Sequence, residues 1–355
     1  MTALAVSDWQ VAAPKLFGVL LGLSLAYLIS VDTPSSGRVH LLWLGLAIGM
    51  ASLITIAALF LTEWPQRKLL PLDGLYTLLP MGPRVVDHGG RLGGIGPNQI
   101  GGSLALLVPL TLALSLNRTE TRRIVCTVAA LVLVYALAVL LLTQSRSAYV
   151  GAVVGQALVG WWWLRQRAWF RRHPWALMAI NATVSLAVVG LLAATAFTWL
   201  APFDSTTDTL KGRLTIWSVS TLLIGEHLYT GVGPGHFSLA LKSTFPQLSA
   251  SVAPYVPHAH NLILQTLLDL GLTAAVLLGT LIAVALRGLI TVARAADDSS
   301  RQLLAVGLIG SLAAFFVYGL TDTIAPGARG GLPFWLVLGL AVACARPARR
   351  HRHPG

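Results

Sequence analysis

The chain contains 355 residues, of which 55% are hydrophobic and only 11% are charged, and its formal net charge is +12. A soluble domain carries about 25% charged residues, so this composition excludes a soluble enzyme. The two cysteines, Cys126 and Cys344, stand in apolar runs, which excludes a disulfide framework and a cysteine-based zinc cluster. Basic residues collect in the cytoplasmic loops of membrane proteins, so the positive charge indicates membrane topology rather than nucleic-acid binding.

Nine segments have the length and apolar character of a membrane-spanning helix, which needs about 20 residues. We therefore predict an all-α, polytopic membrane helix bundle that forms one transmembrane domain over residues 1–355. A tenth, broken span is predicted over 69–86, because the charge pattern of the flanking loops needs one more crossing. The nine clear spans are expected at 13–31, 41–62, 99–116, 124–143, 148–164, 175–200, 261–286, 302–320 and 331–345.

Clusters of arginine follow three of these spans, and a fourth cluster lies in the C-terminal tail. Placing these clusters inside predicts that both termini are cytoplasmic, with 17 of the 25 basic residues inside, Lys15 included. The loops 144–147, 201–258 and 321–330 are then outside. The positive-inside rule does not explain the basic residues left outside, which are Arg38, Arg84, Arg91, Arg146, Lys211, Arg213, Lys242 and Arg329.

The stretch 201–258 is the only sizeable predicted element outside the membrane, and loops of this length are usually functional. Apolar residues recur near the helical period after Gly212, so the interior of the stretch is predicted to be a helix. The glycines and proline between 231 and 235 end this helix, and a second short helix is expected over 236–244. The repeating residues are Ile216, Trp217, Ser220 and Leu223.

Three external arginines are candidates for binding an anion. Arg146 lies in a tight turn between two spans, where an ionisable group suggests a functional site, the alternative being a snorkelling interfacial arginine. Arg91 stands among five glycines in the loop 87–98, whose backbone N–H groups can cradle an anion, unless the loop is a plain flexible turn. Arg213 shares a helix face with Trp217 near a helix N-terminus, which favours an anion, the alternative being simple packing on the indole.

His258 and His260 lie where the long loop enters a membrane span, and an imidazole there suits proton abstraction near neutral pH. A His-x-His metal site is the competing interpretation, but no carboxylate or thiol stands close by in the sequence. A structural histidine at a helix start is the third possibility. Asp269, inside the span, is expected to pair with another helix and receives no catalytic role.

Four motifs occur in order along the chain and together resemble the superfamily of O-antigen ligases and O-antigen polymerases. The resemblance covers about residues 90–290, and Gly-Pro-Asn at 96–98 also fits it. The motifs are Thr-Gln-Ser-Arg-Ser-Ala-Tyr-Val-Gly at 143–151, Gly212-Arg213 with Trp217, Gly-Val-Gly-Pro-Gly-His-Phe at 231–237, and His258-Ala-His260-Asn261 followed by Gly271.

The resemblance implies a multi-pass protein of the bacterial inner membrane with an active site at the periplasmic face. It implies inverting glycosyl transfer from a polyprenyl (undecaprenyl) diphosphate-linked glycan to a hydroxyl acceptor, with no metal and no cofactor. His260 matches the expected general base, while Arg146 and Arg213 match the arginines expected to hold the donor pyrophosphate, with Arg91 as a looser third. The other residues expected to bind substrate are Asn98, Trp217, His258 and Asn261.

Ligase and polymerase share this chemistry and differ in the acceptor, which is lipid A-core for a ligase and a lipid-linked repeat for a polymerase. We favour a ligase slightly. A reading from another class is a transporter of a bicarbonate-like anion, in which the arginines would line a pathway. The clustering of the arginines with a histidine at one face, and the lack of an inverted repeat, disfavour transport.

Overall fold

The computed structural model describes residues 8–31, 37–62, 64, 96–116, 123–173, 175–176, 210–251, 256–295 and 299–346. Within these ranges the regular secondary structure is helical and no β-strand occurs, which confirms the all-α prediction. The broken span 69–86, the loop that carries Arg91, and nearly all of the span 175–200 lie outside the described residues.

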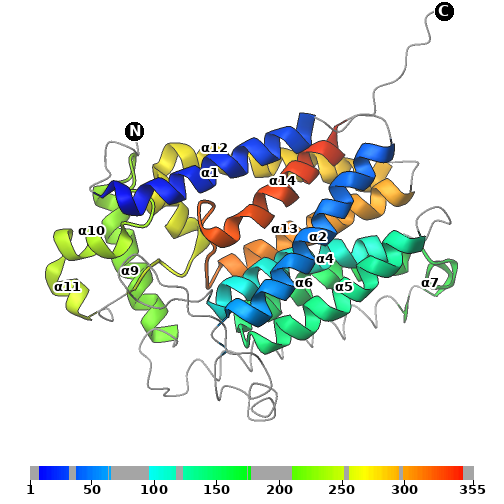
Figure 1. Cartoon of the computed structure of the whole chain (residues 1–355), viewed down its shortest axis with the longest axis horizontal. Coiled ribbons are helices and arrows are strands. Elements are labelled where there is room, and N and C mark those ends of the chain that lie inside the picture. Colours follow the sequence, from blue (N-terminus) through cyan, green and yellow to red (C-terminus); the bar gives the residue numbers. More distant parts are fainter. Residues whose placement is uncertain are drawn as a thin grey trace, which may run out of the picture.

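Eight of the nine clear predicted spans coincide with helices of one bundle (Figure 1). Five helices, α1, α4, α5, α12 and α13, are long and apolar enough to cross a membrane, so the chain is a multi-helix membrane protein. The apolar stretches of α2 and α14 are shorter, and the total number of crossings stays a prediction. The bundle helices are α1 (Trp9–Val31), α2 (Gly37–Leu61), α4 (Pro97–Leu116), α5 (Arg123–Leu142), α6 (Arg146–Arg165), α12 (Leu262–Ala295), α13 (Ser299–Gly319) and α14 (Leu332–Ala345), with the short α7 (Ala168–Arg172) after α6.

Small residues bring the central helices α4, α6 and α13 close together. A Cβ atom placed on Gly155 of α6 would lie 2.6 Å from the carbonyl oxygen of Gly310 of α13, so only glycine fits there. A Cβ atom on Gly102 of α4 would lie 2.5 Å from the ring of Tyr318, near the end of α13. Such close approach is the usual basis of helix packing in membranes. It fixes the last turn of α13, from which part of the candidate site follows.

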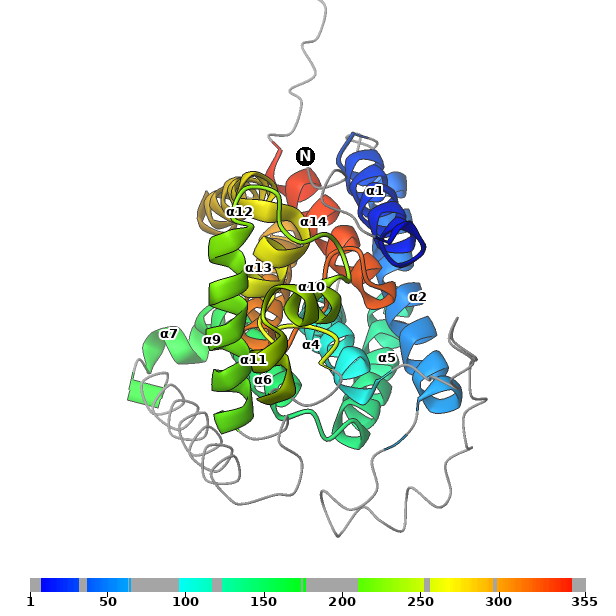
Figure 2. The same cartoon turned by 90° about the vertical axis from the view of Figure 1, so that its left-hand side faces the viewer.

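Three short helices form a cap at one end of the bundle (Figure 2). We use "the cap" for residues 210–251, which contain α9 (Leu210–Glu226), α10 (Phe237–Thr244) and α11 (Pro246–Ser251). The two helices predicted in this stretch are confirmed, although α9 begins two residues before Gly212, and α11 was not predicted. The cap has its own buried core, made by Ile216, Val219, Leu223, Ile224, Val232, Phe237 and Leu241.

The cap is attached to α12 through backbone contacts at two glycines. Gly231 and Gly271 both have positive φ angles, of 67° and 75°, which glycine adopts without steric cost. The backbone N–H of Val232 donates to the carbonyl of Leu268 at 2.7 Å, next to the point where α12 kinks at Gly271. The connection between α9 and α10 therefore sits directly on the first turns of α12.

The helices α1 and α14 run in the same direction, which places the start of α1 and the end of α14 at opposite ends of the bundle (Figure 1). Gly18 packs against Gly327, just before α14, and Gly22 packs against Trp335 within it. Lys15 stands beside Gly235 of the cap, so it lies at the cap end. The sequence had grouped Lys15 with the inside residues because the first segment carries a single lysine, which is a weak guide to orientation. The side of the membrane on which each terminus lies stays a prediction.

In Figure 1, α2 runs back toward the end of the bundle where the cap lies, and α4 starts at that end. The tenth span predicted over 69–86 lies outside the described residues, so it stays a prediction.

Candidate active site

The His258-Ala259-His260 turn lies between the cap and the start of α12. Ala259 is fully buried in the cap core, so the two flanking histidines project from a fixed point. The φ angle of His260 is 48°, a left-handed conformation that side chains other than glycine rarely adopt. In the described ranges the one other non-glycine residue with positive φ is Gln144, in the turn before Arg146. Strained backbone of this kind concentrates at functional sites.

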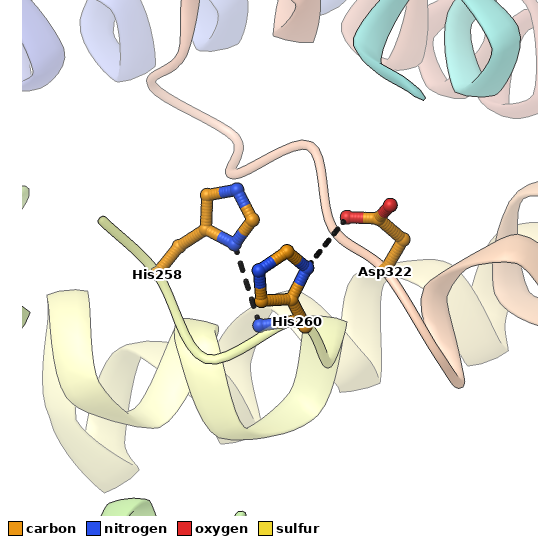
Figure 3. A group of neighbouring side chains, drawn as sticks. All are labelled: His258, His260 and Asp322. Carbon is orange, nitrogen blue, oxygen red and sulfur yellow. Dashed lines mark hydrogen bonds and ion pairs between the residues drawn. The ribbon is translucent and has the colours of Figure 1, made fainter. Parts of the chain in front are cut away.

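His260 faces a carboxylate from another part of the bundle. Its Nδ1 lies 3.3 Å from Oδ1 of Asp322, which follows α13 (Figure 3). The Asp322 side chain is 2% exposed, whereas that of His260 is 16% exposed and therefore reachable from solvent. Oδ2 of Asp322 is buried and accepts no hydrogen bond from the part of the chain that the structure describes. Asp322 thus directs its charge at the imidazole.

The segment from Tyr318 to Asp322 gathers the other candidate residues around this pair. Asn261 donates its side-chain N–H to the carbonyl of Leu320 at 3.0 Å, and Arg213 donates to the carbonyl of Thr321. Tyr318 donates its hydroxyl to the carbonyl of Asn98 at 3.0 Å. The end of α13 and the residues directly after it therefore contact the starts of α12, α9 and α4.

Two further contacts hold the histidine turn. The indole N–H of Trp217 donates to the carbonyl of His260 at 3.4 Å. Oδ1 of Asn261 accepts from the backbone N–H groups of Ile263 and Leu264, at 3.0 and 3.1 Å, and so caps α12. Asn261, at which the predicted span 261–286 begins, is therefore the capping residue of α12.

His258 and Asp322 differ in their charge at physiological pH. The pKa of His258 is lowered to about 4, mainly by burial. The neighbouring His260, Lys15 and Arg213 also lower this pKa, and Asp322 raises it. His258 is therefore neutral at physiological pH. Burial acts to raise the pKa of Asp322, but the close contact with His260 and the charge of Arg213 keep that pKa below its ordinary value. Asp322 is thus an anion.

This arrangement can activate His260 as a base. An Nδ1–H pointing at Asp322 leaves the lone pair on Nε2, which lies on the side of the ring away from the carboxylate (Figure 3). The carboxylate also stabilises the imidazolium that forms when Nε2 takes a proton. Arg213, which is 6% exposed, brings a permanent positive charge to the same site.

In the sequence, a metal site was disfavoured because no carboxylate stands near the two histidines. In the folded chain a carboxylate, that of Asp322, does lie close to them. One ligand atom from each of His258, His260 and Asp322 lies within 4.8 Å of the others. Asp322 was missed because it is distant in the chain and the sequence pattern around it is plain. The available signal was a carboxylate in a short loop between two apolar spans.

The predicted site residues fall into three groups. Arg213, Trp217, His258, His260 and Asn261 are brought together by the contacts above, and Asn98 joins them through Tyr318. Arg146 is the first residue of α6 at the same end of the bundle, where its turn packs on Gly101 of α4. Arg91 lies outside the described residues.

An apolar groove opens beside the histidine turn, between α12, α13 and α14. Its volume is about 120 Å³, and its lining includes Leu262 and Ile263, which follow Asn261 directly. The groove continues along α12 past Gly279, where an added side chain would meet nothing within 4 Å. Pro326, four residues after Asp322, borders it as well. We refer to it as the α12 groove.

Comparison with known proteins relates most of this site to one family. No curated protein matches the chain at a significant level. Residues 131–279 match the model of a family described as O-antigen ligase, whose members are glycosyltransferase-type enzymes. The matched range contains Arg146, Arg213 and the histidine turn, while Asn98 and Asp322 lie outside it. Residues 131–279 are thus similar to the O-antigen ligase family, which supports the resemblance to that superfamily.

Proposed function

We propose that this protein is an inverting, metal-independent glycosyltransferase that moves a glycan from a polyprenyl diphosphate donor to a hydroxyl acceptor, as an O-antigen ligase. The observation that supports it best is the His260–Asp322 pair, with an Nδ1 to Oδ1 distance of 3.3 Å, beside the buried Arg213. A base next to a fixed cation is what transfer from a diphosphate leaving group requires.

The donor diphosphate binds at Arg213 and Arg146, with Arg91 as a third candidate. A guanidinium stays charged at all physiological pH values and matches phosphate oxygens with two parallel hydrogen bonds. Both arginines lie at the cap end of the bundle, Arg213 in the first turn of α9 and Arg146 at the first residue of α6. Their charge stabilises the negative charge that grows on the departing diphosphate.

The transfer itself is a single displacement. Nε2 of His260 takes the proton of the acceptor hydroxyl as that oxygen forms a bond to C1 of the sugar. The bond between C1 and the diphosphate oxygen breaks, and polyprenyl diphosphate leaves with the electron pair. Attack from the face opposite the leaving group inverts C1, so no second carboxylate is needed as a nucleophile. Asp322 keeps His260 in the tautomer that has its lone pair on Nε2.

The polyprenyl chain of the donor occupies the α12 groove. Its wall is formed by apolar residues including Ile282, Phe315 and Phe334, and it meets the site at Leu262 and Ile263. A lipid with its diphosphate at Arg213 therefore has an apolar path away from the site along α12. This placement keeps the chain in the membrane while the sugar reaches His260.

The function is tested with purified protein in liposomes, a polyprenyl diphosphate glycan as donor, and two acceptors supplied separately. His260→Ala should lower transfer roughly a hundred- to ten-thousand-fold while donor binding is kept. Arg213→Gln should instead weaken donor binding. Product with lipid A-core identifies a ligase, whereas product only with the lipid-linked repeat identifies a polymerase.

Two outcomes would contradict the proposal. Full transfer by His260→Ala would remove His260 as the base. Absence of product with both acceptors, together with anion flux across the liposome membrane, would favour the transporter alternative. In that case the cluster at the cap end would be an ion-binding site rather than a catalytic one.

A further inference from the structure

A buried chain of hydrogen bonds connects the cap to the histidine turn through two side chains of α12. Oδ1 of Asp269 accepts from Nε2 of Gln265 at 2.8 Å and from the backbone N–H of Gly235, in the cap, at 3.2 Å. Oε1 of Gln265 accepts the backbone N–H of Ala259 at 2.8 Å. Asp269, Gln265 and Ala259 are 4%, 2% and 0% exposed, so water does not compete for these bonds. The contact expected between Asp269 and another helix is thus a bond to the cap backbone.

The spacing of the two side chains explains how the connection forms. Gln265 and Asp269 are four residues apart and share one face of the first turns of α12. That face is turned toward the cap, because the backbone of Val232 bonds to Leu268 on the same turn. The α12 helix therefore presents a polar ladder that begins at the cap and ends at the histidine turn.

The carboxylate of Asp269 determines which way the amide of Gln265 points. An ionised carboxylate only accepts hydrogen bonds, so it must be met by the NH₂ group of the glutamine. The amide oxygen then has to face the other way, toward the N–H of Ala259. Without this constraint the amide could rotate and present a donor to another donor, which would leave a buried N–H unpaired.

The backbone of Ala259 matters because the next residue is His260, whose φ angle is 48°. A left-handed conformation at a bulky residue persists only where its surroundings hold it. Trp217 holds the carbonyl side of this residue and Asn261 caps the helix that follows. The hydrogen bond from the Ala259 N–H to Gln265 holds the backbone that precedes His260.

We propose that Asp269 and Gln265 are positioning residues, which orient the histidine turn so that His260 faces Asp322. This inference rests on the proposed function, in which His260 is the base. Neither residue touches the reacting atoms. Their effect passes through Ala259 to the geometry of the imidazole, and it should appear in the rate of the chemical step rather than in donor binding.

The test compares four variants in the transfer assay. Gln265→Met keeps the length of the side chain but accepts no amide hydrogen bond, and it should lower kcat at least tenfold with the donor KM changed less than twofold. Asp269→Leu should do the same. Asp269→Asn keeps an oxygen for Gln265 and Gly235 and should retain kcat within about threefold. Thr111→Val is the matched control, because its hydroxyl is buried and donates to the carbonyl of Val108 within α4, away from the α12 groove and the histidine turn.

A double-mutant measurement separates positioning from general damage to the fold. Residual transfer by His260→Ala should be unchanged when Gln265→Met is added, because the geometry of an absent imidazole has no effect. An equal fall in both backgrounds, or an unchanged kcat for Gln265→Met alone, would overturn the inference. If instead His260→Ala itself keeps full transfer, the proposed function fails, and the two failures are thereby told apart.

Discussion

The bundle and the cap are held together by different forces. In the bundle, Gly151 and Gly155 let α6 approach the backbone of α13, and Gly102 lets α4 pack closely on the ring of Tyr318. The cap has a small apolar core, but its attachment to α12 uses backbone hydrogen bonds at Gly231 and Gly271 and the polar ladder at Asp269. Close apolar packing fixes the bundle, whereas the cap combines apolar packing on Leu268 of α12 with directional polar bonds.

The candidate site lies along the boundary between these two regions. The bundle supplies Asp322, while Arg213 comes from the cap and His260 from the turn between the cap and α12. Moving the cap relative to the bundle would change the His260 to Asp322 distance. The proposed chemistry therefore depends on the position of the cap on α12 more than on either region by itself.

The largest effect is expected from breaking the pair across the boundary. Asp322→Asn removes the charge that holds the His260 tautomer, and it should lower kcat about a hundredfold in the transfer assay. The fold should survive because the asparagine oxygen can still accept from the backbone N–H of Thr323, a bond of 2.8 Å in the native protein.

The matched control for this variant is the next residue. The Thr323 hydroxyl is buried and has no hydrogen-bond partner in the described part of the chain, so Thr323→Val should keep kcat within about twofold. Equal activity of Asp322→Asn and Thr323→Val would mean that the carboxylate has no part in the reaction.

A smaller effect is expected from filling the α12 groove, which belongs to the bundle alone. Gly279→Trp places an indole in the open space of the groove and should raise the KM for a long-chain donor about tenfold, the equivalent of roughly 1.4 kcal/mol of binding. A donor with only two isoprene units should be used as well as before, since its chain does not reach Gly279.

Gly160 of α6 provides the control, because an added side chain there also meets nothing within 4 Å. Gly160→Trp should leave the KM for both donors unchanged. A similar rise in KM from both tryptophan variants would indicate a general effect on the membrane-embedded protein rather than occupation of the groove.

The smallest effect is expected in the acid stability of the histidine turn. The pKa of His258 is about 4 in the folded protein against an ordinary value of 6.5, so the unfolded chain takes up a proton first as the pH falls. The contribution of His258 to stability therefore decreases between pH 6.5 and pH 4, by about 1 kcal/mol from pH 7 to pH 5.5.

Thermal unfolding in detergent at these two pH values measures this loss, and His258→Gln should show less of it. Asp322 does not affect this comparison. Its pKa is lowered in the folded protein, so its contribution to stability changes only at pH values below its ordinary pKa. An identical pH dependence in His258→Gln would show that the loss arises from other groups.

Several features of this protein could be predicted from the sequence because they depend on local pattern. Long apolar runs predicted the helices of the bundle, since a run of this length has no other way to satisfy its backbone in a membrane. The spacing of Ile216, Ser220 and Leu223 predicted the buried face of α9, and all three are at most 1% exposed. The glycines at 231 and 235 predicted a break, and both have positive φ angles.

The direction of the helices could not be predicted as well, because it depends on packing. Charge counting did not predict that α1 and α14 run in the same direction, whereas the contacts of Gly18 and Gly22 with the α14 region show it. A few isolated charges shift an orientation by little free energy, and the interlocking of helix surfaces decides it.

The residues of the candidate site divide in the same way. His258 and His260, Arg213 and Arg146 stand in short motifs, so their residue types and spacing were enough to single them out from the sequence. Asp322 has no such motif, and Gln265 and Asp269 look like ordinary helix residues. Only the folded chain brings them to the histidine turn, because a hydrogen bond depends on distance and direction in space, and neither is encoded in the order of residues along the chain.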